Sequence, residues 1–90
     1  MIHVKRLILD VLKPHHPDVL EFAKTIAALA LGYQVNLTVK EIDDKTETLE
    51  LIVEGPNVDR KLIEAAIKEM GGSVHSLDGV EVINIAEKGH

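Results

Sequence analysis

The chain has 90 residues, 46% of them apolar, which is enough for the core of one domain spanning residues 1–90 and excludes two domains. It has no cysteine, which excludes disulfides, thiolate zinc sites and cysteine nucleophiles. Its net charge of −5 and its only two aromatic residues, Phe22 and Tyr33, argue against nucleic acid binding. No apolar run reaches the ~18 residues of a membrane span and no signal segment is recognisable, so a soluble cytoplasmic domain is predicted.

The first half of the chain begins with a strand and a helix. Apolar and polar residues alternate from His3 to Lys13, which predicts a strand that Pro14 ends. Pro17 suits the first position of a helix, and apolar residues recur at helical spacing as far as Leu31. Gly32 is then the predicted end of this helix.

A hairpin and a second helix follow. The alternating runs from Val35 to Ile42 and from Thr48 to Glu54 predict two strands joined by a short acidic turn. Asn57 is a candidate N-cap for a helix that continues to Met70. The two glycines that come next, beginning at Gly71, predict its end.

The last predicted element is a β-branched stretch from Ser73 to Ile85 that Asp78 and Gly79 interrupt. It is either one long strand with a bulge at these two residues or a strand followed by an extension. The resulting order, βαββαβ, is typical of a ferredoxin-like α+β fold, with an antiparallel sheet in the order 4-1-3-2 and two helices on one face. The residues predicted to face the helices are Leu7, Leu9, Val11, Val35, Leu37, Val39, Leu49, Leu51 and Val53.

Two strings of this sequence resemble an archaeal family known as domain of unknown function 211. They are Leu9-Asp10-Val11-Leu12-Lys13-Pro14-His15 and His75-Ser76-Leu77-Asp78. The resemblance covers most of the chain. It implies a ferredoxin-like fold in a cyclic homo-oligomer, and it implies no established activity.

Two apolar surfaces are predicted to remain uncovered, which favours self-association. The end of the first helix is apolar almost all round, and strand one places apolar side chains on the open face of the sheet. The candidate interface residues are Leu20, Ala27, Ala28, Leu31, Tyr33, Ile8 and Leu12. Exposed alanines that serve only as good helix formers are the simpler alternative. A second alternative is an engineered assembly subunit whose Ala27–Leu31 patch contacts a second protein component.

A candidate cation site comes from the topology, because three separate segments are predicted to end at the same end of the sheet. The oxygen donors would suit Ca²⁺ or Mg²⁺, and the imidazoles would suit a transition metal. The candidate ligands are Asp43, Asp44, Glu47, Asp78, His15 and His75. An ordinary solvated turn that needs no metal is the simpler alternative for the acidic segment.

Asp10 interrupts an otherwise apolar strand, so its carboxylate needs a partner. Arg6 on the same face and Lys40 across the sheet are the candidates for an ion pair. An enzyme using Asp10 and His75 as acid and base is the least favoured alternative. The leading interpretation is a non-enzymatic, homo-oligomeric domain, with cation or small-ligand binding as its suggested role.

Overall fold

The computed structural model describes residues 1–86 and contains six elements in the order βαββαβ. Their bounds are β1 (Ile2–Pro14), α1 (Val19–Ala27), β2 (Gln34–Ile42), β3 (Thr46–Glu54), α2 (Arg60–Glu69) and β4 (Ser73–Asn84). No helix within residues 1–86 is long and apolar enough to cross a membrane.

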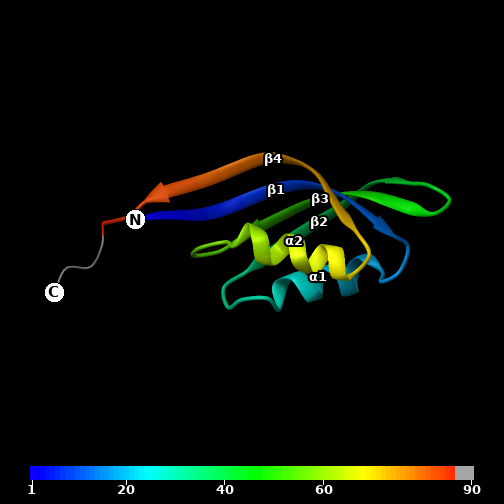
Figure 1. Cartoon of the computed structure of the whole chain (residues 1–90), viewed down its shortest axis with the longest axis horizontal. Helices are drawn as coiled ribbons and strands as arrows, with labels where there is room; N and C mark the ends of the chain where they lie inside the picture. Colours follow the sequence, from blue (N-terminus) through cyan, green and yellow to red (C-terminus); the bar gives the residue numbers. More distant parts are fainter. Residues whose placement is uncertain (87–90) are drawn as a thin grey trace.

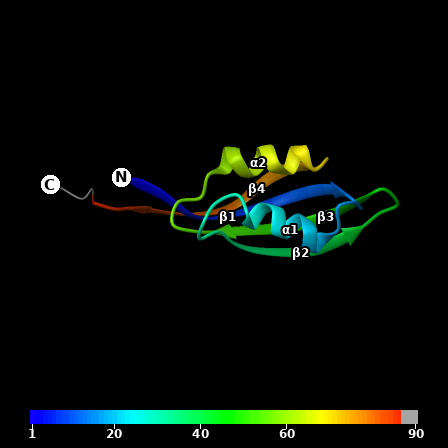
Figure 2. The ribbon, with the colours of Figure 1, turned by 90° about the horizontal axis from the view of Figure 1, so that it is seen from below.

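The four strands form one sheet in the order β2-β3-β1-β4, and every neighbouring pair is antiparallel. This is the predicted order read from the other edge. Both helices lie on the same side of the sheet (Figures 1 and 2). The predicted ferredoxin-like fold is therefore confirmed.

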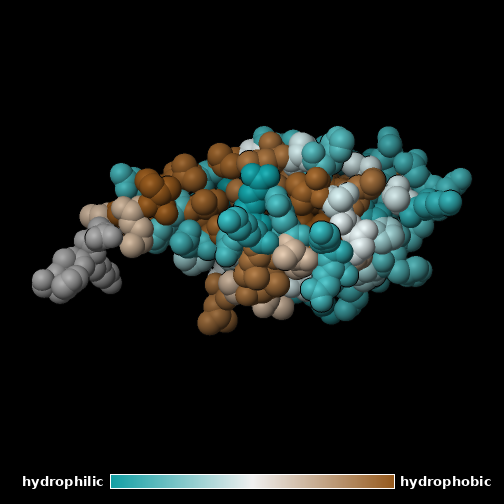
Figure 3. All heavy atoms as spheres, in the orientation of Figure 1, coloured by the Kyte–Doolittle hydropathy of each residue, from teal (hydrophilic) through white to brown (hydrophobic). Residues whose placement is uncertain are grey.

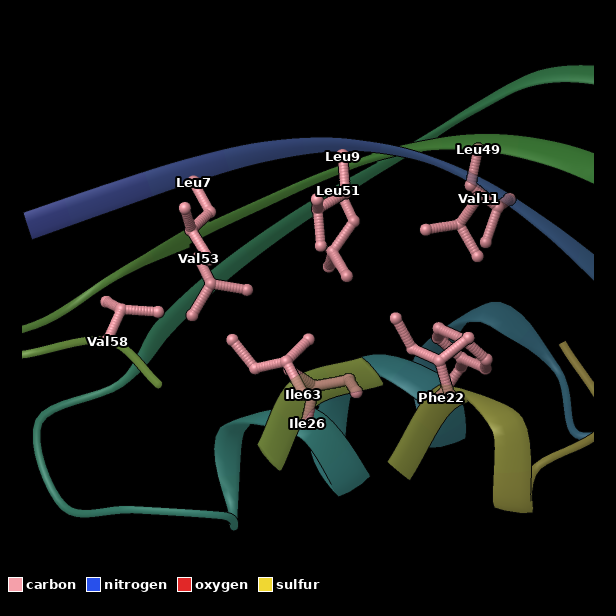
Figure 4. Packing of buried hydrophobic residues seen from close by; sticks show 11 residues of the cluster. Leu7, Leu9, Val11, Phe22, Ile26, Leu49, Leu51, Val53, Val58 and Ile63 are labelled. Atoms are coloured by element: carbon pink, nitrogen blue, oxygen red, sulfur yellow. The ribbon is translucent and has the colours of Figure 1, made fainter. Parts of the chain in front are cut away.

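The core lies between the sheet and the two helices (Figure 4). Its buried residues come from alternate positions of β1 and β3 and from one face of each helix, with Val58 from the loop before α2. They are Leu7, Leu9, Val11, Phe22, Ile26, Leu49, Leu51, Val53, Val58, Ile63 and Ile67. The predicted β2 residues also pack against this core but are only partly buried, because β2 is an edge strand.

The helix α1 is shorter than predicted, since it ends at Ala27 instead of Leu31. The chain must reverse direction to enter β2, and it does so through turns in which Leu29 N–H donates to the carbonyl of Ile26. Gly32 completes the reversal at φ +87°, a conformation that favours glycine. A Cβ there would also lie 2.9 Å from Pro56, so the position of this loop depends on Gly32.

The helix α2 begins later than predicted. Its N-cap is Asp59, whose carboxylate accepts the N–H of Leu62. The side chain of Asn57 instead accepts the N–H of Val4 and so binds β1. The predicted glycine stop is confirmed. Gly71 has φ +86°, and the amides of Gly71 and Gly72 bond the last carbonyls of the helix.

The predicted bulge in β4 is confirmed. Gly79 lies opposite Ile8 and Leu77 lies opposite Leu9, which leaves Asp78 without a partner on β1. A second irregularity leaves His75 unpaired in the same way. Because bulges twist an edge strand away from further pairing, β4 is poorly suited to adding another strand.

Candidate functional site

A two-stranded ribbon extends beyond the rest of the molecule. The strand β1 pairs with β3 only from Arg6 to Pro14, but it continues to pair with β4 as far as Ile2. The ribbon, defined here as residues 1–5 and 80–85, projects past β2, β3 and both helices (Figures 1 and 2). It contributes to an elongated shape of 56 × 22 × 17 Å.

One edge of the ribbon is partly covered by the loop that follows β3. The amide of Gly55 donates to the carbonyl of Lys5, and the amide of Val58 donates to the carbonyl of Val4. The side-chain oxygen of Asn57 accepts the N–H of Val4 at 3.2 Å. The loop therefore replaces β3 as the neighbour of β1 at Val4 and Lys5, and it leaves the faces of the ribbon and the outer edge of β4 uncovered.

One face of the ribbon continues the apolar face of the core. Val80 lies opposite the buried Leu7, and Val82 lies opposite Val4, so these side chains share the side of the sheet that the helices cover further along. Within residues 1–86 no helix reaches them. Val80 and Val82 are each 55% exposed and Ile2 is 63% exposed. Figure 3 shows the hydrophobic atoms gathered on this end of the molecule.

The predicted patch around the end of α1 is also exposed. Leu31 is 99% exposed, Ala28 is exposed and Ala27 is half-buried. Leu20 is 63% exposed but is the second residue of α1, so it lies at the other end of the helix. Because Ala28 and Leu31 lie in the connection after the helix, the patch belongs partly to a loop. Figure 3 shows hydrophobic atoms over this connection, separate from those of the ribbon.

The other predicted interface residues differ in their surroundings. The hydroxyl of Tyr33 accepts the N–H of Asp59 at 2.7 Å, so this side chain ties the loop after α1 to the start of α2. Ile8 lies over Gly79, where an added Cβ would approach its Cδ1 to 2.9 Å. Leu12 remains 39% exposed on the open face.

A charged cluster occupies the end of the sheet where the cation site was predicted. Lys13 is fully buried, and its Nζ donates to the carbonyls of Pro14 at 2.8 Å and Pro17 at 2.7 Å. It also lies 3.1 Å from Oε1 of Glu47. The other oxygen of Glu47 lies 3.0 Å from Nδ1 of His15. One carboxylate is thus shared by two basic side chains.

These contacts shift two ionisation equilibria in opposite directions. The hydrogen bond to Glu47, followed by that to the Asp44 carbonyl, raises the pKa of His15 above its ordinary 6.5. The same hydrogen bond from His15, together with that from Lys13, lowers the pKa of Glu47. Each charged form therefore stabilises the other.

The six predicted cation ligands are not brought together. His15 and Glu47 contact each other, and Asp43 and Asp44 are exposed in the neighbouring turn. Asp78 lies beside Ile8 and Leu9 of β1, whereas Glu47 lies opposite Lys13. These two positions are about 13 Å apart along the strand. His75 lines a pocket on the opposite face of the sheet. Residues 1–86 contain no group of three or more His, Asp or Glu side chains placed to hold a metal ion.

We accordingly expect Ca²⁺, Mg²⁺ and Zn²⁺ at millimolar concentration to leave the thermal unfolding midpoint unchanged. Glu47 is already neutralised by Lys13, so a cation would have to displace a buried ammonium group. The measurement is a thermal melt with each ion and with a chelator. A rise in midpoint that Asp43→Asn with Asp44→Asn removes would contradict this expectation, because an ion bound only to the folded form raises the midpoint by mass action.

Asp10 does not form the predicted ion pair with Arg6 or Lys40. Arg6 instead lies opposite Glu81 of the neighbouring strand, with its Nε 3.8 Å from that carboxylate, and this partner is closer than a residue four positions along β1. Asp10 and His75 both line an open pocket of about 250 Å³, together with Leu12 and Thr48. No hydrogen bond joins Asp10 to His75 in the described part of the chain.

Fold and surface together define a ferredoxin-like domain with an uncovered apolar ribbon, and comparison with known proteins gives its family. The family model for domain of unknown function 211 (DUF211), described as "Uncharacterized ArCR", matches residues 5–87. An uncharacterized protein of Methanocaldococcus jannaschii, MJ0319, is 40% identical over 77 residues, which are 86% of this chain and 79% of that protein. The chain belongs to the DUF211 family, whose function is unknown.

Proposed function

We propose that this chain is a non-enzymatic subunit that assembles with further copies of itself through the ribbon. The observation that supports the proposal is that the ribbon continues the apolar face of the core past the end of the helices. Val80 and Val82 share the face of the buried Leu7, yet each is 55% exposed. An apolar sheet face needs a cover, and contiguous exposed patches usually mark interfaces.

A second copy of the chain can cover the apolar face of the ribbon, because the chain carries another exposed apolar surface. The connection after α1 carries a separate apolar surface, away from the ribbon (Figure 3). Its residues Ala28 and Leu31 are exposed. When two different surfaces of one chain contact each other between copies, the contact is head-to-tail, and repetition of it closes a ring if the rotation permits. The bulges of β4 disfavour pairing of strand edges, so packing face to face is favoured.

The test is the mass in solution of the unmodified chain and three variants. We expect an oligomer for the chain and dissociation for Val82→Lys, because burying an unpaired ammonium group in an apolar contact costs several kcal/mol. A loss of about 3 kcal/mol raises the dissociation constant more than a hundredfold. Ile42→Lys is the matched control, since Ile42 is 67% exposed in the hairpin at the opposite end of the sheet.

A mixing experiment tests the head-to-tail arrangement. Val82→Lys and Leu31→Lys should each be monomeric, whereas an equimolar mixture should give a dimer, because one intact ribbon can meet one intact patch. Assembly of Leu31→Lys alone into the full oligomer would assign the α1 patch to a different partner protein. A 9.9 kDa species alone for the unmodified chain at micromolar concentration would overturn the proposed function.

A further inference from the structure

The imidazole of His15 lies between two hydrogen-bond acceptors. Its Nδ1 is 3.0 Å from Oε2 of Glu47, and its Nε2 is 3.0 Å from the main-chain carbonyl of Asp44. Neither acceptor can donate when Glu47 is ionised. A neutral imidazole carries a proton on only one nitrogen, so only the imidazolium satisfies both contacts.

We propose that His15 is a pH-operated latch, which as the imidazolium ties the loop between β1 and α1 to the turn between β2 and β3 and to the start of β3. Loss of its proton leaves one nitrogen facing an acceptor that it cannot bond, so one of the two ties is released. The latch joins segments 29 and 32 residues apart in the chain. The latch therefore determines how strongly these segments are held together at this end of the sheet.

The charges around His15 favour the imidazolium on balance. Glu47 supplies a carboxylate whose side chain is only 14% exposed, and Asp43 and Asp44 lie in the turn beside the ring. Lys13 opposes it as a second cation, but its Nζ already forms an ion pair with Oε1 of Glu47 and donates to the carbonyls of Pro14 and Pro17. The pKa of His15 is raised accordingly, chiefly by the hydrogen bond to Glu47.

The direct test is nuclear magnetic resonance of the imidazole nitrogens of the unmodified chain. At pH 6.5 both nitrogens of His15 should carry a proton, and the midpoint of their titration should lie above 6.5. The amide of Asp43, which donates to the carbonyl of Thr46 within the turn, should exchange faster once His15 is neutral. A single protonated nitrogen at pH 6.5, or a midpoint at or below 6.5, would overturn the proposal.

Variants of His15 and Glu47 give a second test, in which the free energy of unfolding is measured against pH. The directions of the two pKa shifts determine the sign of the expected change. Because folding raises the pKa of His15, its stabilising contribution is present below pH 6.5 and is lost as the pH rises through the higher value in the folded chain. Because folding lowers the pKa of Glu47, its contribution is present above pH 4.5 and is lost as the pH falls. The latch is therefore strongest between those two values.

The advantage of the unmodified chain over His15→Gln in free energy of unfolding should accordingly decrease from pH 6.5 to pH 9. Glu47→Gln should lower the titration midpoint of His15, while His75→Gln, which changes an exposed histidine on the opposite face, should not. A difference between the unmodified chain and His15→Gln that stays constant from pH 6 to pH 9 would also contradict the latch. The mass in solution, measured on the same variants, keeps this test independent of the proposed assembly.

Discussion

Replacing Lys13 by methionine should lower the free energy of unfolding by about 3 kcal/mol, the lower end of the range for breaking a buried ion pair. Methionine fills a similar volume but leaves Glu47 with His15 alone, and it removes the donor for the carbonyls of Pro14 and Pro17. Lys13 is fully buried, so water cannot replace these contacts without opening the loop. Urea unfolding at pH 7 and fixed protein concentration measures the change.

The control is Lys24→Met, which removes a similar side chain from an exposed pair. Lys24 lies 3.5 Å from Glu21 on the surface of α1, and such pairs contribute roughly 0–1 kcal/mol. Adding Glu47→Leu to Lys13→Met should recover part of the loss, since an apolar pair replaces the unmatched carboxylate. Equal effects of Lys13→Met and Lys24→Met would show that the buried pair does not stabilise the fold.

The elements and their order could be predicted from the sequence because the evidence for them is local. Alternation fixed which residues of β1 and β3 face the helices, and the two glycines after α2 marked its end. The end of α1 was wrong because Ala28 to Leu31 are good helix formers that the return to β2 takes out of the helix. Asn57 was wrong as a cap because a distant contact, with Val4, uses its side chain.

The candidate sites were predicted less well, because they depend on which face of the sheet each side chain occupies and on where each strand ends. Local sequence patterns do not contain this information. Topology places His15, Glu47 and His75 at one end of the sheet, but His75 lies on the open face and the other two do not. Lys13 follows the parity of the core positions, yet its burial depends on carbonyls of the loop after it. The overhang of the ribbon depends on where β3 ends relative to β1, which only the register reveals.

Replacing Phe22 by alanine should lower the free energy of unfolding by about 3–5 kcal/mol, the range for truncating a buried aromatic side chain. Phe22 is fully buried, and its side chain projects from α1 toward the sheet (Figure 4). Its ring centroid is 6.0 Å from Nζ of Lys13, so the truncation also removes a cation–π contact from a buried ammonium group. A domain of this size has roughly 5–14 kcal/mol of stability in total, so the truncation should remove between about a fifth and all of it.

Two further variants distinguish the free-energy cost of the cavity from other effects of a substitution in α1. Phe22→Leu keeps most of the volume and should cost clearly less than Phe22→Ala, because the cavity left behind is smaller. Leu20→Ala removes apolar volume from the same helix at a position that is 63% exposed, and it should change the free energy of unfolding by no more than about 0.5 kcal/mol. A fully buried ring cannot be removed without leaving either a cavity or a rearranged helix. If Phe22→Ala lowered the free energy of unfolding by less than Leu20→Ala does in urea, Phe22 would therefore not be the centre of the core.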